Sequence, residues 1–409
     1  MRSIPLKRIA RLQADVQRSD PDGLLTLDVV ESGTGRLLSD PWKSPSGPPS
    51  AGVADVEPGD VLFGKLRPYL AKVVHANRSA YASTELMCLR PRPGIDPRWF
   101  FYRMLARPTI NWAVAASEGT KMPRTSWERL GEFRVDVPEE TEQRALAEYL
   151  DAEAARIDAL ISKKRQLQAR VDERTRVELT EVACGRTSGQ RLRDSELPWL
   201  GAIPATWQVE RLKFMARLET GHTPSRTRPE LWENATTPWV TLNEVGYLKE
   251  HQYVHVTTNF ISEEGLASSS ARVLPAGTVI LSRDATVGRC GILARPMATS
   301  QHFVNWICGE RLKPEYLWLV LRTAMQGHFI SLTAGATIKT IGMPQVNEFV
   351  VPLPSLGEQE QLTQDAVRIR GTSESLIASI DLQISRLREH RQALITAAVT
   401  GELNVPGTA

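Results

Sequence analysis

The clearest periodic pattern of apolar residues lies in residues 141–185. This stretch has no Pro, and no Gly before its last residue, and it is rich in Ala, Glu, Arg, Leu and Gln, which favour the helix. Its apolar residues follow the heptad pattern of a coiled coil, with polar residues at some positions. A helix of about 40 residues is about 60 Å long and cannot bury such a seam alone, so the pattern predicts a partner helix. The predicted seam is Leu146, Leu150, Ile157, Leu160, Leu167 and Val171.

The chain supplies this partner by repeating the stretch. A shift of 216 residues, the separation of Phe133 from Phe349, also aligns Pro138 with Pro354 and Gln143 with Gln359 without a gap. These residues are not seam positions, so the match exceeds what similar helix composition produces, and a long-period repeat decides the architecture. The second stretch, residues 358–401, carries the predicted seam Ile369, Leu376, Ile380, Leu387 and Leu394.

The regions before the two stretches have the pattern of globular domains. A turn at Pro58-Gly59-Asp60 precedes a β-rich run, and the same pattern returns at residues 276–283. A helix is predicted at residues 97–106, with its counterpart at residues 313–323. The plan is therefore globular domain, helix, globular domain, helix, and the globular parts have diverged more than the helices.

Composition places the chain among ordinary globular proteins. Its hydrophobic fraction is 42% and its charged fraction 24%. No apolar run is long enough for a membrane span, and the N-terminus lacks the apolar core of a signal peptide. Four cysteines without a C-x-x-C pair indicate a reducing compartment, so we expect a cytoplasmic protein. The net charge of +3 permits a nucleic-acid partner without arguing for one.

Motifs that would indicate an enzyme are weak. Residues 59–65 fit G-x-x-x-x-G-K, but Leu66 replaces the Ser or Thr that holds Mg²⁺, and Pro68 is incompatible with the helix that should follow. His251 and His255 lie in a β-like run without a third ligand, so we expect no metal site there. No methyltransferase motif and no glycine-rich S-adenosylmethionine loop is present. We therefore expect a non-catalytic chain.

The two helical stretches resemble the conserved regions of type I restriction–modification specificity subunits. In that family a Pro-Leu-Pro segment and a Glu-Gln pair precede each long helix, as Pro352-Leu353-Pro354 and Glu358-Gln359 do here. The family's ending matches residues 391–401, RQALITAAVTG. The first copy departs modestly, with Asp136-Val137-Pro138 at its start and residues 182–185 at its end. The resemblance covers essentially the whole chain.

The resemblance implies an α+β fold in which two globular α/β target recognition domains alternate with two long helices that pair as an antiparallel coiled coil. The implied segments are residues 1–139 for target recognition domain 1, 140–186 for the first long helix, 187–199 for a linker, 200–355 for target recognition domain 2, 356–402 for the second long helix and 403–409 for a tail.

The resemblance also implies a function. Each recognition domain would read one half of a bipartite target in double-stranded DNA, and the helices would set the spacer and dock two methyltransferase subunits. S-adenosylmethionine would be bound by those methyltransferase partners, and ATP and Mg²⁺ by restriction subunits, if the system has them. This chain itself would need no cofactor and no metal.

Basic residues near the predicted turns are the candidates for DNA contact, because Lys and Arg hold phosphates and read guanine. They follow the repeated strand or precede the long helices, and for each one a solvated surface charge is the alternative. The candidates are Lys65, Arg67, Lys121 and Arg124 in the first domain, and Arg283, Arg289 and Lys339 in the second.

Two other interpretations stay open. The chain could be a non-catalytic coiled-coil adaptor whose globular domains bind peptides; its binding would lack the steep salt dependence of a DNA complex. The other is a fragment of a fused restriction–methylation enzyme. We expect a separate chain instead, from its own start and its Gly-Glu-Leu-Asn-Val finish.

Overall fold

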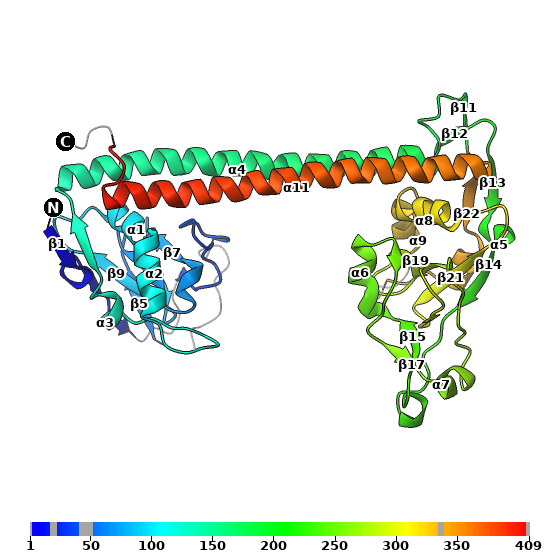
Figure 1. The fold of residues 1–409 in the computed structure, drawn as a ribbon, viewed down its shortest axis with the longest axis horizontal. Coiled ribbons are helices and arrows are strands. Elements are labelled where there is room, and N and C mark those ends of the chain that lie inside the picture. Colours follow the sequence, from blue (N-terminus) through cyan, green and yellow to red (C-terminus); the bar gives the residue numbers. More distant parts are fainter. Residues whose placement is uncertain (1, 17–22, 41–51, 334–338, 406–409) are drawn as a thin grey trace. The chain divides into compact units, whose positions relative to one another are not determined.

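Two long helices dominate the computed structural model, which describes residues 2–16, 23–40, 52–333 and 339–405 (Figure 1). They are α4, Glu140–Ala183, and α11, Leu356–Thr400. The chain divides into two compact units, residues 1–166 with 379–409 (unit 1) and residues 167–378 (unit 2). Each unit therefore contains one globular part and one portion of both helices. The predicted fold class is confirmed. No helix among the described residues is long and apolar enough to cross a membrane.

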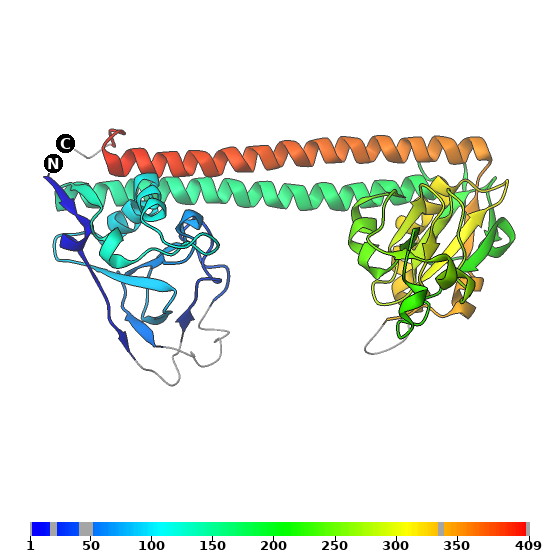
Figure 2. The same ribbon diagram turned by 60° about the horizontal axis from the view of Figure 1, so that its bottom comes forward.

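The helices pair antiparallel within each unit (Figure 2). In unit 1, Leu146 and Leu150 share a core with Ile395 and Val399, whereas Ile157 and Ile161 pack with Ile380 and Ile384. In unit 2, Leu179 shares a core with Leu362, and the Thr175 hydroxyl donates to Ser373 Oγ at 2.8 Å. In both units, positions later in α4 therefore meet positions earlier in α11.

The predicted seam is wrong at Leu160, Leu167 and Leu376. Their exposed fractions are 42%, 46% and 46%, so they lie on the outer faces of the helices. The residue that follows each of them is less exposed. Ile161 has an exposed fraction of 7%, and Gln168 and Ile377 are both partly buried. Neighbouring residues on a helix point about 100° apart, so only one of two adjacent apolar residues can face the partner. The Leu-Ile pairs left that choice ambiguous, and the structure places isoleucine inward both times.

The remaining predicted seam residues face the interior. Leu146, Leu150, Ile157 and Ile380 are buried, and Val171, Ile369, Leu387 and Leu394 are partly buried. Thr175 and Ser373 lie in the seam at a place where hydrophobic residues are scarce, and their hydroxyl groups form a hydrogen bond with each other. The portion of the pair around Thr175 and Ser373 in unit 2 is thus held by a polar contact, whereas the isoleucine cluster holds the pair in unit 1.

Unit 1 contains two four-stranded sheets, with orders β2-β9-β6-β7 and β3-β5-β8-β4, and the ribbon β1-β10. The strands are β1 Arg2–Pro5, β2 Ala10–Leu12, β3 Asp15–Val16, β4 Leu24–Leu25, β5 Val53–Val56, β6 Val61–Gly64, β7 Val73–His75, β8 Ala80–Ser83, β9 Leu86–Pro91 and β10 Arg134–Val137. The shorter helices are α1 Pro97–Leu105, α2 Arg107–Ala115 and α3 Trp127–Leu130, with 3-10 turns at Leu6–Arg8 and Pro68–Leu70.

Unit 2 contains a five-stranded sheet β14-β21-β18-β19-β16, a three-stranded sheet β17-β15-β20, and the ribbons β13-β22 and β11-β12. The strands are β11 Leu192–Asp194, β12 Ala202–Pro204, β13 Gln208–Arg211, β14 Ala216–Thr220, β15 Thr237–Val240, β16 Tyr253–Val254, β17 Phe260–Ile261, β18 Val279–Ser282, β19 Cys290–Leu293, β20 Ala298–Thr299, β21 Phe303–Cys308 and β22 Val350–Leu353. The shorter helices are α5 Leu212–Met215, α6 Val245–Glu250, α7 Glu263–Ala267, α8 Pro314–Arg322, α9 Gln326–Leu332 and α10 Met343–Asn347, with 3-10 turns at Pro229–Leu231 and Leu242–Glu244.

One sheet has the same strand order in both units. The order β2-β9-β6-β7 corresponds to β14-β21-β18-β19, and α1 corresponds to α8. The central strands β6 and β18 are wholly buried because both of their faces are covered. In β6, Val61 and Phe63 face the core beneath α1, whereas Leu62 faces the core of the second sheet. This two-sided burial explains why these segments read as short continuous apolar runs.

A buried glutamine joins each long helix to its globular part. The side chain of Gln143 accepts a hydrogen bond from Asp96 N at 2.8 Å and donates to Gly94 O and Pro138 O at 3.2 and 2.9 Å. The side chain of Gln359 makes the same three contacts, with Lys313 N, Arg311 O and Pro354 O at 2.8, 2.9 and 3.0 Å. The repeated Glu-Gln pair of the sequence thus contains a fold-determining glutamine.

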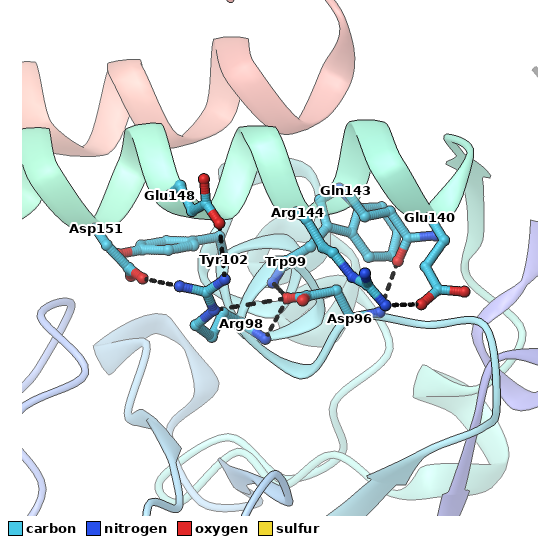
Figure 3. A network of polar contacts seen from close by, with 9 residues as sticks. All are labelled: Asp96, Arg98, Trp99, Tyr102, Glu140, Gln143, Arg144, Glu148 and Asp151. Carbon is cyan, nitrogen blue, oxygen red and sulfur yellow. Dashed lines mark hydrogen bonds and ion pairs between the residues drawn. The ribbon is translucent and has the colours of Figure 1, made fainter. Parts of the chain in front are cut away.

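Figure 3 shows the contacts around Gln143 that fix α1 against α4. Asp96 caps α1 by accepting from the backbone nitrogens of Arg98 and Trp99. One turn further along α4 than Glu148, Asp151 accepts from Tyr102 Oη at 2.8 Å and pairs with Arg98 Nη1 at 2.9 Å. The start of the helix is therefore tied to the globular part by polar side chains as well as by the apolar core.

The Gln143→Ala variant is expected to destabilise unit 1. The substitution leaves three buried or half-buried backbone groups without their partner, at a cost of about 2–4 kcal/mol. Chemical denaturation of the full chain, followed by hydrogen exchange in α1, measures the loss. Gln166→Ala, an exposed glutamine of the same helix, is the control and should change stability by less than about 0.5 kcal/mol. Equal effects from the two variants would contradict the role assigned to Gln143.

The start of α11 has a second polar anchor, the carboxyl of Glu358. It accepts from the Ser355 backbone and hydroxyl at 2.9 and 2.7 Å, from Gln190 at 3.0 Å and from Trp207 Nε1 at 3.2 Å. Burial raises the pKa of this carboxyl, but these hydrogen bonds outweigh burial and lower the pKa to about 2. The charged form is therefore favoured in the folded state.

This shift predicts an acid-sensitive contribution to the stability of unit 2. A carboxyl whose folded pKa is depressed stabilises the fold above its unfolded pKa of 4.5 and loses that contribution as the pH falls toward 2. The wild-type chain should therefore lose more stability between pH 5 and pH 2.5 than Glu358→Gln, which has no charge to lose. Denaturation midpoints of the two chains across this range provide the test, and parallel pH profiles would refute the assignment.

Candidate nucleic-acid interface

In unit 1, the loop after β6 runs beside the segment that precedes α3. Arg67 N donates to Pro123 O at 2.7 Å, and Thr125 N donates to Lys65 O at 2.9 Å. Leu66 and Arg124 form an isolated antiparallel bridge between these contacts. We call residues 65–70 and 118–125 the first loop pair. It brings together four of the predicted DNA-contacting residues, which are far apart in the sequence.

Unit 2 has the equivalent arrangement after β18. Ala285 N donates to Lys339 O at 3.1 Å, and Ile341 N donates to Arg283 O at 2.9 Å. Asp284 and Thr340 form the bridge. We call residues 283–289 and 339–341 the second loop pair. All three backbone contacts of the first loop pair therefore have a counterpart here, although the side chains differ.

Both loop pairs contain a left-handed residue that is not glycine. Arg67 has φ +49° and Ala285 has φ +58°. This conformation costs an L-residue roughly 1–2 kcal/mol, and it persists where surrounding contacts determine the backbone. The same strained position in both units, each donating the backbone hydrogen bond to the facing segment, indicates that the loop shape is maintained while its side chains vary.

The first loop pair presents cations to solvent. Arg67, Lys121 and Arg124 are exposed. Tyr69 and Met122 are exposed by 55% and 54%, so large apolar side chains lie on the same loops. Lys65 differs, because it is half-buried and its Nζ donates to Thr84 O at 2.8 Å. The geometry thus assigns Lys65 a structural contact and leaves three exposed cations for a ligand.

The cations of the second loop pair are less accessible to solvent than those of the first. The Arg283 side chain is 22% exposed, donates from Nη1 to Ile341 O at 3.2 Å, and pairs weakly with Asp284. Lys339 is exposed, and Arg289 is half-buried. Of the three predicted residues, Arg283 mainly holds the loop together, and Lys339 is the most accessible cation.

Sequence reasoning missed a polar cluster beside the second loop pair. His302 Nδ1 lies 3.1 Å from Asp284 Oδ2, and Gln301 lies next to both His302 and Thr223. Asp284 follows β18, while the other residues come from distant segments, so only the pairing of β18 with β21 brings them together. These side chains offer donors and acceptors of a kind that reads base edges.

The cysteines and carboxylates do not form a metal site in the described part of the chain. No group of three His, Cys, Asp or Glu side chains there has a metal-binding arrangement. Burial raises the pKa of the Cys290 thiol to about 12 and that of Cys184 to about 11, which suppresses the reactive thiolate. Burial likewise raises the pKa of Cys308 to about 12. The loop pairs are thus the features best suited to contact a ligand.

Replacing Ala285 by glycine is expected to stabilise unit 2. Glycine adopts positive φ without the steric penalty of Ala, so the free energy of unfolding should rise by about 1 kcal/mol. Ala378→Gly, at an exposed position of α11, serves as the control and should lower it by up to about 1 kcal/mol. Denaturant titration of both variants decides the matter; destabilisation by Ala285→Gly would show that the loop is not strained at this residue.

Comparison with known proteins identifies a matching family model and several related proteins. The family model described as "Type I restriction modification DNA specificity domain" matches residues 204–364, which lie in unit 2 and include β18 and α8. The MjaIX specificity subunit of Methanocaldococcus jannaschii is 28% identical over 166 residues, covering 40% of this chain and 38% of that protein. The HindI specificity subunit of Haemophilus influenzae is 20% identical over 341 residues, covering 69% of this chain and 73% of that protein.

Solved structures share the fold over nearly the whole chain. The HsdS subunit from Thermoanaerobacter tengcongensis has a TM-score of 0.54 at 18% identity and covers 98% of this chain and 97% of its own. A chain from a study of type I restriction–modification complex assembly has a TM-score of 0.69 at 17% identity, with 98% of each chain covered. The fold is therefore shared with these structures over nearly the whole chain, and residues 204–364 match the type I restriction modification DNA specificity domain.

Proposed function

We propose that this chain is the DNA-specificity subunit of a type I restriction–modification system, in which each loop pair reads one half of a bipartite target. The observation that carries the proposal is the duplicated loop pair. Its backbone contacts recur in both units, while its side chains differ. A shared frame with different side chains is what two readers of different half-sites require.

The chemistry of each loop pair supports DNA as the ligand. The exposed Arg67 and Arg124 can donate bidentately to guanine N7 and O6 or to phosphates, and Lys121 can neutralise a phosphate. Tyr69 and Met122 add exposed apolar surface that suits thymine methyl groups or stacked bases. In unit 2, Asp284 bridges to Thr340 next to Lys339, and His302 and Gln301 beside Asp284 add further donors and acceptors. The two halves of the target should therefore differ in sequence.

The remaining parts of the proposal concern partners. We propose that the chain is non-catalytic and that two methyltransferase subunits, using S-adenosylmethionine, dock on the repeated helices. Restriction subunits that use ATP and Mg²⁺ would complete a cleaving complex. The helices α4 and α11, of 44 and 45 residues, would set the number of unread base pairs between the half-sites. The names of the relatives and the duplicated helix starts at Gln143 and Gln359 support this assembly.

A peptide-binding adaptor is the competing function, and no observation favours it. A complex with DNA should weaken steeply with salt, with a log–log slope of about 0.9 per phosphate neutralised, whereas a peptide complex lacks such a slope. The exposed cations on the first loop pair suit a polyanion better than an uncharged peptide.

Substitutions in one loop pair are expected to relax one half of the target. The double variant Arg67→Ala and Arg124→Ala should lose about 1–3 kcal/mol of discrimination per base contact, a factor of about 5–150, at the first half-site. Selection from a random duplex pool by the full chain with its methyltransferase measures the preference at every position. Lys339→Ala should weaken only the second half-site or its flanking phosphates.

The controls lie in the same chain. Each variant should leave the other half-site unchanged, and Arg134→Ala, an exposed arginine of β10 outside the loop pair, should leave both unchanged. If the first loop pair variant kept a wild-type preference in both halves, the loop pair would not be the reading surface. If it altered both halves alike, the assignment of one half to each unit would be wrong.

A further inference from the structure

Unit 1 contains a cationic groove in which its globular part meets the long helices. The groove has a volume of about 490 Å³. Five cationic side chains line it, against two carboxylates, Glu31 and Asp158, which leaves an excess of three positive charges. The five cations are Arg36, Lys72, Arg165, Arg388 and Arg391.

A buried arginine forms the floor of this groove. Arg391 is 5% exposed, and its Nη1 and Nη2 donate to Gly33 O and Thr34 O at 3.1 and 2.7 Å. Its Nε has no hydrogen-bond partner and lies 3.5 Å from Asp158 Oδ1. Asp158 Oδ2 also lies 3.8 Å from Arg36 Nη1. One carboxylate therefore faces two guanidinium groups, and the positive charge is only partly compensated.

Two further arginines rim the groove and are accessible. Arg165 approaches Glu31 at 3.9 Å, and its side chain remains 53% exposed. Arg388 is exposed, and none of the ion pairs identified in the described residues involves it. Placing like charges around a cavity is unfavourable unless a counter-charge enters. The groove thus has the charge distribution of an anion site.

The groove adjoins the first loop pair. Gly64 N, at the end of β6, donates to Lys72 O at 2.8 Å, so the backbone of a groove residue lies beside the start of the loop. Ala71 O accepts from Gly33 N at 3.1 Å, which links the same segment to the loop that holds Arg391. Residues 65–72 therefore connect the first loop pair to the groove, and cationic side chains lie along this segment.

The counterpart of this groove in unit 2 has a smaller excess of positive charge, because four cationic side chains line it against three carboxylates: Arg176, Lys249, Arg322 and Arg370 against Asp172, Glu250 and Glu374. At the positions that the repeat aligns with Arg388, Arg391 and Asp158, it carries Asp172, Thr175 and Glu374. Arg176 there is paired with Glu173, and Lys249 with Glu250. The cations at positions 388 and 391 are therefore specific to unit 1 and are not a by-product of the repeat.

We propose that the groove of unit 1 binds phosphate groups of duplex DNA that lie outside the bases read by the first loop pair. This inference rests on the proposed DNA-recognition function and adds a second, sequence-independent contact to it. Backbone contacts fix register and orientation without carrying sequence information. Because the excess of positive charge is larger in unit 1, the phosphates beside the first half-site would be bound more tightly than those beside the second.

The test uses the salt dependence of binding to a duplex without the target sequence. The double variant Arg165→Ala and Arg388→Ala removes two exposed cations of the groove and leaves the buried Arg391 in place. Fluorescence anisotropy with the full chain between 50 and 200 mM salt should show a log–log slope smaller by about 1.8, from 0.9 per phosphate. Across this range, the affinity advantage of the wild type over the variant should shrink about 12-fold.

Arg170→Ala with Arg386→Ala is the matched control. These arginines are exposed, lie on the same two helices at positions the repeat aligns, and are outside the groove. The control should keep the wild-type slope. A wild-type slope in the groove variant would overturn the inference and leave the proposed function intact. If the wild-type chain itself showed no salt-dependent DNA binding, both would fall.

Two additional measurements identify another occupant. Calorimetry with pyrophosphate tests whether a free phosphate compound binds in the groove. Binding that requires Arg165 and Arg388, together with an unchanged salt slope for DNA, would assign the groove to a small ligand and contradict the proposed DNA contact.

The affinity for the methyltransferase should be unaffected by the groove variant. A loss of that affinity with an unchanged DNA slope would assign the groove to an acidic protein surface and also contradict the inference.

Discussion

The buried glutamine at the start of each long helix is the interaction on which the structure depends. Gln143 and Gln359 each satisfy one backbone nitrogen and two backbone oxygens of neighbouring segments. A side-chain amide is suited to this because it carries both a donor and an acceptor group. Glutamate or leucine at the same place would leave backbone groups unpaired. The helix start, the strand that precedes it and the loop before α1 or α8 are thereby joined at one point.

From this joint the geometry of the loop pairs follows within each unit. In unit 1, α1 packs on the sheet that contains β6, and β6 leads directly to residues 65–70. The left-handed Arg67 then directs its amide to Pro123, and the same occurs at Ala285 and Lys339. Exposed side chains are thus carried by a backbone that is fixed by burial, hydrogen bonds and local strain, which is the preorganisation that selective binding needs.

Much of this architecture could be predicted from the sequence, because the repeat and the helix pattern are local and strong signals. Phe133, Pro138 and Gln143 have counterparts at a constant shift, and the structure places Phe133 directly before β10 and the other two at the start of α4. The seam was misassigned at Leu160 and Leu376, because adjacent Leu and Ile residues are equivalent by hydrophobicity and differ only in the direction they face. At Leu167 it was misassigned because the polar Gln168, and not the leucine, lies toward the interior.

The candidate site was less predictable, because it depends on contacts between distant segments. The repeat placed the basic candidates at similar positions in the two domains, but it did not predict that Arg67 lies beside Arg124 or Arg283 beside Lys339. The structural roles of Lys65 and Arg283 and the pair of His302 with Asp284 were not predicted either, since they depend on which backbone oxygen or carboxylate lies within reach in the folded sheet. Which bases the exposed side chains contact stays a prediction.

A map of DNA methylation tests whether the two loop pairs read two half-sites. The full chain is co-expressed with a type I methyltransferase subunit that binds it, in a host without other adenine methylation, and methyladenine is located across the genome. If the two loop pairs read two half-sites, the map should show one split motif, with two short defined halves of different sequence around a fixed run of unspecified bases. A single continuous motif, or no new methylation despite a stable complex, would contradict the claim that two loop pairs read two half-sites.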